Sequence, residues 1–272
     1  GGRYECNDYL ELLPRYSSEY SAFVPIGNGC DNFCSYCVVP YARGREKYRP
    51  AADILREAEN LAGQGYKEIT LIAQNVNSYR HQGVDFPALL EQIDPIPGDF
   101  WIRFATSHPK DMSPALVQAI KQSRKICQHI HLPAQSGSNQ VLGAMNRRYT
   151  REHYLDLVKM IRQELPEASL TTDIIVGFPG ETRDDFNLTL DLFRECRFDM
   201  AYIARYSPRP GTAALAWEDK VPAEEKKRRE EELMAVLRRT AYDNNLELEG
   251  KTEIVLVDGR DRQGRFYGKT GT

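Results

Sequence analysis

The sequence lacks the features of a membrane or secreted protein. No run of about 18 apolar residues, the length of a transmembrane helix, occurs in its 272 residues. The first residues do not form a signal-peptide pattern. Neither sign of charge is in excess, since 36 Lys and Arg face 39 Asp and Glu, although a local basic patch can still bind nucleic acid. We therefore expect a soluble, globular, cytoplasmic protein without a membrane partner.

Cysteine is scarce outside one short stretch. Half of the six cysteines lie within eight residues, Cys30, Cys34 and Cys37, while the others are isolated, Cys6, Cys127 and Cys196. A disulfide explains the cluster poorly, because three thiols leave one unpaired and such close neighbours strain the bridge. A structural zinc ion needs a fourth ligand, and no His or Cys occurs between residue 38 and His81. Three sulfurs suit an iron–sulfur cluster in which one iron atom keeps a free coordination position. A zinc knuckle and a chance clustering of structural cysteines are the alternative interpretations.

Strands and helices alternate from residue 21 onward. Apolar runs predict six strands, at residues 22–26, 68–73, 100–105, 126–132, 170–176 and 200–206. Apolar residues at helical spacing predict helices between them, starting near Pro50, Phe86, Ser113, Thr150 and Thr182. Alternation implies a parallel sheet with right-handed crossovers, and six units are too few to close an eight-stranded barrel. We predict an α/β fold, an open, partial (β/α)6 barrel.

Polar or glycine-rich segments follow every predicted strand. In such folds the chemistry occurs at the carboxyl ends of the strands, and the cysteine loop follows the first strand. The later strand ends should therefore supply pocket residues. Asp173 is the strongest single candidate, because an acid inside the apolar strand 170–176 needs a buried partner or a cationic ligand. His108 is either a pocket residue or a cap for the helix near Ser113.

The cysteine spacing, with Tyr36 before the last cysteine, resembles the signature of the radical S-adenosylmethionine (SAM) enzymes. The strand ends narrow this resemblance to the radical SAM methylthiotransferases, over a match that runs from about Ser21 to the C-terminus. The segments that carry it are residues 29–44, 74–79, 106–109, 131–138, 175–182 and 208–212. Residues 38–41, 74–77 and 106–109 are most similar to the branch that acts on N6-isopentenyladenosine beside the tRNA anticodon.

This resemblance implies a reaction and its cofactors. A methylthio group would be added to C2 of the adenine ring in the tRNA anticodon stem-loop, with an electron donor protein as a second partner. Cys30, Cys34 and Cys37 would ligate a [4Fe–4S] cluster whose open iron binds SAM. The implied SAM pocket comprises Tyr36, Gln74, Ser136, Asp173, Phe178 and Arg205, without catalytic residues beyond the cofactor ligands.

Two other classes of function stay open. A related radical SAM enzyme would modify threonylcarbamoyladenosine in tRNA or an aspartate of a ribosomal protein. A non-enzymatic module that binds metal or RNA is the more distant alternative. In each case we expect a monomer.

Basic residues follow the cysteine loop at alternate positions, Arg43, Arg45, Lys47 and Arg49. An extended segment would place all four on one side, so we predict phosphate contacts rather than an ordinary solvated face. A second basic cluster follows the fourth strand, Arg147, Arg148 and Arg151.

We divide the chain into a linker at residues 1–20, a radical SAM core at 21–248 and part of a TRAM domain at 249–272. A charged helix starting near Val221 should pack on the barrel. A hairpin of residues 253–257 and 265–268 resembles the start of the small RNA-binding TRAM barrel. The family carries a further N-terminal domain with a second [4Fe–4S] cluster, which nothing before Ser21 supplies. We therefore expect this chain to cleave SAM without completing methylthiolation.

Overall fold

The computed structural model describes residues 10 and 14–272, so Cys6 and most of the predicted linker lie outside the described residues. Within the described part, six parallel strands form two sheets of three, in the orders β1-β4-β7 and β10-β9-β8. Their bounds are β1 (Ser21–Pro25), β4 (Glu68–Ile72), β7 (Trp101–Phe104), β8 (His129–His131), β9 (Ser169–Val176) and β10 (Met200–Arg205). The predicted strands are all present.

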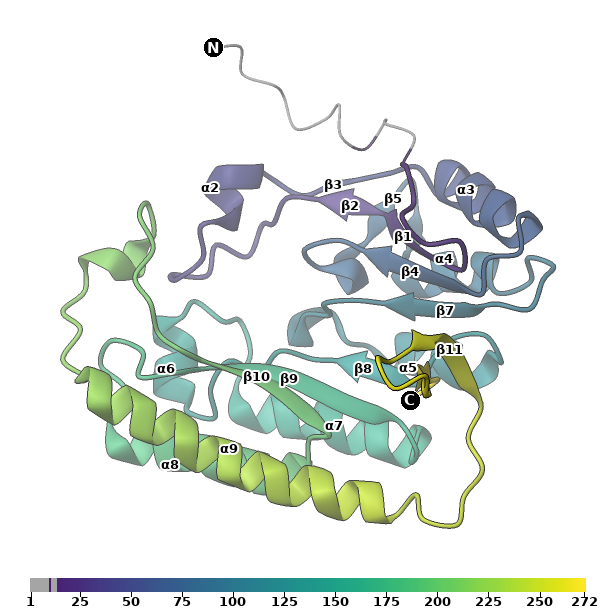
Figure 1. Cartoon of the computed structure of the whole chain (residues 1–272). Coiled ribbons are helices and arrows are strands. Elements are labelled where there is room, and N and C mark those ends of the chain that lie inside the picture. The colour runs from purple at the N-terminus through teal and green to yellow at the C-terminus, as the bar shows by residue number, and fades with distance from the viewer. Residues whose placement is uncertain (1–9, 11–13) are drawn as a thin grey trace.

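A narrow junction joins the two sheets. Ile102 of β7 forms a parallel bridge with Ile126, and its carbonyl accepts a hydrogen bond from the Cys127 N–H at 2.9 Å. The predicted strand at residues 126–132 is therefore shortened to His129–His131, because its first residues make only this bridge. The resulting series of six strands is the predicted open half-barrel (Figure 1).

Helices cover the outer face of the half-barrel. They are α3 (Ala51–Gly63), α4 (Phe86–Ile93), α5 (Pro114–Gln122), α7 (Arg151–Glu164), α8 (Arg183–Cys196) and α9 (Ala223–Leu246). The predicted caps form: the side chains of Ser113, Thr150 and Thr182 each accept a hydrogen bond from the first turn of their helix. The long helix α9 packs along β10 and α8, as Figure 1 shows. No helix of the described residues is long and apolar enough to span a bilayer.

Strand alternation separates a packed outer face from an open inner face. Outward residues such as Val24, Leu71 and Ile130 are fully buried against the helices. On the inner face, Phe23 of β1 and Tyr202 of β10 are 60% and 61% exposed. The hydrophobic core thus lies between the sheet and its helices, and the concave inner face remains accessible.

Short elements not predicted from the sequence surround the strand ends. They include α2 (Val39–Arg43), α6 (Asn139–Ala144), the ladder of β2 (Gly27–Asn28) with β3 (Lys47–Tyr48), the ladder of β5 (Arg80–His81) with β6 (Val84–Asp85), and the 3-10 turns η1 (Val76–Ser78), η2 (Pro109–Asp111) and η3 (Ala213–Ala216). His108 caps η2, because its Nδ1 accepts from the Lys110 N–H at 3.2 Å, while Ser113 caps α5.

The C-terminal hairpin packs against the amino ends of the first strands (Figure 1). It consists of β11 (Val255–Arg260) and β12 (Phe266–Thr270), so its first strand begins two residues after the predicted strand 253–257 and ends three residues after it. Glu68, at the start of β4, is 2% exposed and accepts from Lys269 Nζ at 2.7 Å. The Tyr20 hydroxyl donates to the Asp258 carbonyl at 2.9 Å. These contacts fix the hairpin at the end of the barrel opposite to the cysteine loop.

Candidate metal centre

The cysteine loop lies at the carboxyl end of the half-barrel, between β2 and α2. Gly29 adopts φ +78°, and an added Cβ would lie 2.1 Å from the Arg45 carbonyl oxygen, so only glycine fits there. The Gly29 N–H donates to Gln74 Oε1 at 2.9 Å. The Cys30 N–H donates to the Gly44 carbonyl at 3.1 Å. The loop is thus held from two sides before any ligand binds.

The three cysteines of this loop are free thiols. Burial raises the pKa of the Cys30 and Cys37 thiols above the usual value. Nitrogen donors nevertheless face the sulfurs: Asn75 Nδ2 lies 3.3 Å from Cys30 Sγ, and Arg147 Nη1 lies 3.5 Å from Cys34 Sγ. Such donors stabilise a metal-bound thiolate, so the donor set fits a thiolate-ligated cluster.

No three His, Cys, Asp or Glu side chains in the described part of the chain are arranged to hold one metal ion. This finding concerns a single-ion site such as zinc. The thiolates of a cubane cluster bind different iron atoms, so a cluster does not require three sulfurs to converge on one point.

A cavity of about 520 Å³ lies on the inner face next to the cysteine loop, lined by Tyr36, His131, Gln135, Asp173, Ile174, Ile175, Tyr202 and Ala204. His131 Nε2 lies 3.4 Å from Asp173 Oδ1, and its Nδ1 lies 2.9 Å from Thr171 Oγ1. The ring of Tyr202 meets the His131 ring edge to face at 6.2 Å. The cavity therefore combines an aromatic wall with a carboxylate and an imidazole.

Two of the predicted SAM-pocket residues, Tyr36 and Asp173, meet in this cavity. Gln135 belongs to the strand-end segments from which pocket residues were expected, whereas His131 and Tyr202 were not predicted as pocket residues. Alternation along the strands could have found both, because Tyr202 pairs in register with Asp173, and His131 pairs with Thr171, two residues before Asp173.

Four other predicted pocket residues do not line this cavity. Gln74 holds the cysteine loop, and Phe178 is fully buried with its ring 6.4 Å from that of Tyr36. Ser136 is 2% exposed, with its hydroxyl 3.5 Å from that of Thr189 in α8. Arg205 points outward to α9, where its Nε lies 3.2 Å from Glu230 Oε2. Gln74 and Phe178 therefore support the cysteine loop, whereas Ser136 and Arg205 face the surrounding helices.

The basic segment after the cysteine loop is not one extended strand. Arg43 ends helix α2, which makes that part of the prediction wrong. Arg45 is exposed and pairs with Asp31 at 2.8 Å. Arg49 is largely buried, with Nη2 2.7 Å from Glu57 Oε2 and Nη1 donating to the Pro25 carbonyl at 2.8 Å. Arg49 therefore serves the structure, and the exposed basic surface comprises Arg43, Arg45 and Lys47.

The predicted second basic cluster is also dispersed. Arg147 turns inward to Cys34, Arg148 is exposed, and Arg151 pairs with Glu195. These three side chains lie close in sequence, but they point to different surroundings.

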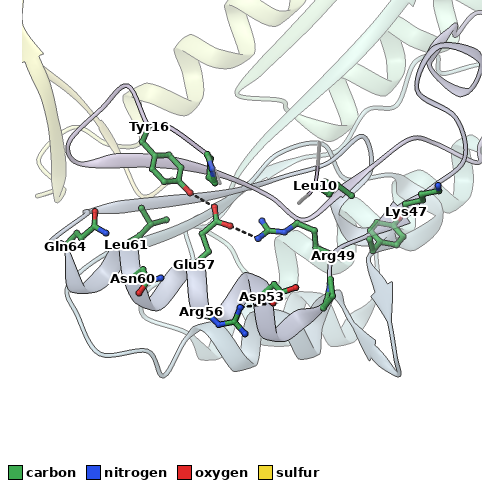
Figure 2. A pocket seen from close by; sticks show the side chains of 13 residues that line it. Leu10, Tyr16, Lys47, Arg49, Asp53, Arg56, Glu57, Asn60, Leu61 and Gln64 are labelled. Carbon is green, nitrogen blue, oxygen red and sulfur yellow. Dashed lines mark hydrogen bonds and ion pairs between the residues drawn. The ribbon is translucent and has the colours of Figure 1, made fainter. Parts of the chain in front are cut away.

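A larger cavity, of about 1000 Å³, lies between the segment around Tyr16, β3 and α3 (Figure 2). The Tyr16 hydroxyl donates to Glu57, which pairs with Arg49, and Figure 2 shows these three side chains in a row. No cysteine or histidine is among the described residues that line it. This cavity offers charged and apolar surface without the groups that bind a metal cluster.

An open α/β half-barrel with three free thiols on the loop after its first strands belongs to the class of barrels that can hold a metal cluster at their mouth. The sequence profile of the radical SAM superfamily matches residues 24–193. The chain belongs to the radical SAM superfamily. Membership of this superfamily implies a [4Fe–4S] cluster and SAM as cofactors.

Two relatives are similar over most of the chain. The tRNA-2-methylthio-N(6)-dimethylallyladenosine synthase of Pelotomaculum thermopropionicum is 48% identical, over 96% of this chain and 62% of the relative. The protein with the same name from Syntrophomonas wolfei is 52% identical, over 88% of this chain and 54% of the relative. The chain therefore spans only about half to three fifths of the length of these relatives.

Solved structures show the same fold. Coproporphyrinogen III oxidase of Escherichia coli has a TM-score of 0.61 at 18% identity, covering 86% of this chain and 56% of that chain. The radical SAM methyltransferase TsrM of Kitasatospora setae also has a TM-score of 0.61, at 21% identity, covering 72% of this chain and 38% of that chain. The predicted partial barrel is thereby confirmed.

Proposed function

We propose that this chain is the radical SAM core of a tRNA methylthiotransferase, which adds a methylthio group to C2 of N6-isopentenyladenosine beside the anticodon. The observation that carries the proposal is the clamped loop of three free thiols next to the Tyr36 cavity. The substrate is inferred from relatives about half identical to this chain, whose name contains the same nucleoside, dimethylallyladenosine.

In this proposal the chain's residues hold and orient the cofactors. Cys30, Cys34 and Cys37 ligate the [4Fe–4S] cluster, which when bound supplies the electron for SAM cleavage. The amides of Asn75 and Asn32, at 3.3 and 3.5 Å from Cys30 Sγ, stabilise the negative charge on that sulfur.

The cavity residues receive the nucleoside parts of the ligands. The carboxylate of Asp173 accepts hydrogen bonds from hydroxyl or amino groups, and His131 orients that carboxylate from 3.4 Å. Tyr36 and Tyr202 provide flat apolar walls, on which a purine ring stacks favourably. The side chains of Gln74 and Phe178 keep the loop and Tyr36 in place for this role.

The surface around the loop suits RNA. Arg43, Arg45 and Lys47 are exposed next to the cysteine loop, where they would contact phosphates of the anticodon stem-loop. We further propose that residues 21–248 are the core and that residues 249–272 are the first hairpin of a TRAM domain. A low-potential electron donor protein completes the set of partners.

Anaerobic reconstitution tests the proposal. The purified chain should take up iron and sulfide, then form 5′-deoxyadenosine from SAM in the presence of dithionite. An assay with tRNA followed by nucleoside analysis tests the proposed substrate. The proposal would be contradicted if the chain bound zinc in place of iron. It would also be contradicted if the iron content stayed full after replacement of all three loop cysteines by alanine.

A further inference from the structure

Arg147 is a partly buried cation that faces a cysteine of the metal site. It follows α6, and its Nη1 lies 3.5 Å from Cys34 Sγ. Among the residues that the structure describes, no carboxylate forms an ion pair with it. A buried charge needs a counter-charge, so the anion expected here is the thiolate itself.

Other contacts fix the guanidinium independently of the cysteine. Arg147 Nη2 donates to the Pro133 carbonyl at 3.0 Å, and Nε donates to the Tyr149 hydroxyl at 2.9 Å. The guanidinium also lies 5.1 Å from the centre of the Tyr149 ring. Tyr149 is buried and donates to the Ala134 carbonyl at 2.9 Å. The Cys34 sulfur therefore faces a positive charge whose position is set by the protein.

We propose that Arg147 raises the reduction potential of the cluster through its charge and its N–H···S hydrogen bond to Cys34. This inference rests on the proposed ligation of the cluster by Cys30, Cys34 and Cys37. Reduction adds one electron to the cluster, taken from a one-electron donor such as dithionite, which is oxidised. The reduced cluster carries one more negative charge, so a fixed cation nearby favours it.

The neighbouring residue provides a matched control. Arg148 is exposed, so replacing it removes the same charge one residue away without touching the sulfur. The variants are Arg147→Gln, Arg147→Lys and Arg148→Gln. Each is reconstituted anaerobically, its iron content is measured, and the cluster is titrated against redox potential with electron paramagnetic resonance as the readout.

The midpoint potential should decrease in the order wild type, Arg147→Lys, Arg147→Gln, because lysine keeps the charge but loses the fixed geometry. Arg148→Gln should match the wild type. An unchanged midpoint potential in Arg147→Gln overturns the inference. This holds even if the variant binds SAM more weakly than the wild type. If Arg147→Gln does not load iron, a wild-type midpoint in Arg147→Lys overturns it.

The failure of this inference can be told apart from the failure of the proposed function. A wild-type chain that takes up no iron contradicts the cluster site itself. A wild-type chain with a normal cluster and an Arg147 variant with the same midpoint contradicts only the role of Arg147.

Discussion

Around the cysteine loop, single side chains offset the effect of burial on the thiols. Desolvation raises the pKa of the Cys30 thiol, whereas the side-chain amide of Asn75 acts in the opposite direction. Metal binding requires thiolates, so it must displace protons here, and the nitrogen donors lower the cost of that step. The polar side chains around the thiols thus contribute directly to metal binding.

Replacing a loop cysteine should remove the cluster. We expect Cys34→Ala to lose its iron and to form 5′-deoxyadenosine only at background level, because one corner of the cluster loses its ligand. Iron analysis and chromatography of the SAM products measure both effects. Cys127→Ala is the control, since Cys127 is buried at the strand junction, and it should keep both properties. Loss of iron in the control variant would show that the assay reports folding rather than ligation.

The buried His108 and the partly buried His129 should make the stability of the protein fall in acid. Burial lowers the pKa of His108 to about 2 and that of His129 to about 4. The unfolded chain binds protons on these residues below pH about 6.5 while the folded chain does not, so the stability is present above that pH and is lost as pH falls. The contribution of His108 to the free energy of unfolding should fall by up to about 1.4 kcal/mol per pH unit between pH 6 and 4.5.

Urea unfolding at several pH values measures this slope. The variant His108→Gln keeps an acceptor for the Lys110 N–H but cannot be protonated, so its stability should depend less on pH. Identical slopes for the variant and the wild type would contradict the assignment.

At the scale of elements, one ion pair connects three segments of the chain. Glu57 of α3 accepts from the Tyr16 hydroxyl and pairs with Arg49 (Figure 2). Arg49 in turn donates to the carbonyl of Pro25 at the end of β1. The N-terminal segment, α3 and the strand that leads into the cysteine loop are therefore held by a single group of contacts.

Removing the ion pair between Arg49 and Glu57 should lower the stability of the protein. Arg49 and Glu57 side chains are only 13% and 12% exposed, so Glu57→Gln leaves a nearly buried guanidinium without its counter-charge. We expect a loss of about 3 kcal/mol in the free energy of unfolding. Glu59→Gln, on the exposed side of the same helix, should change stability by less than about 0.5 kcal/mol. Equal effects of the two variants, measured by urea unfolding, would argue against the role of the ion pair.

At the scale of the whole molecule, the periodicity of the sequence predicted the strands, the helices and the position of the cysteine loop. Periodicity and end signals depend on neighbours in sequence, which is why they could be interpreted without coordinates. The direction in which single side chains point at the strand ends could not be predicted from the sequence. Arg205 and Arg147 both looked like surface or pocket cations, but the packing of α9 and of the segment after α6 turned one outward and the other to Cys34.

The distribution of charge predicts how binding of RNA depends on salt. The variant Arg45→Gln should weaken the affinity for an anticodon stem-loop about equally for different sequences and reduce the salt slope by roughly one. The control Lys220→Gln, an exposed lysine that pairs with Glu218, should leave both unchanged. Fluorescence anisotropy at several salt concentrations gives the slopes. A slope that does not change in Arg45→Gln would favour an ordinary solvated surface.

The edge strands β1 and β10 are not hydrogen-bonded to each other, and each presents an exposed aromatic ring, Phe23 or Tyr202, on the concave side. A closed barrel would admit a reactant only through its ends. For the proposed RNA substrate, an unpaired edge on each side would let a single nucleotide of a continuous strand enter from the side while the rest of the polymer stays outside. The same architecture would therefore allow an internal position of a fully transcribed, folded RNA to be modified without a free terminus.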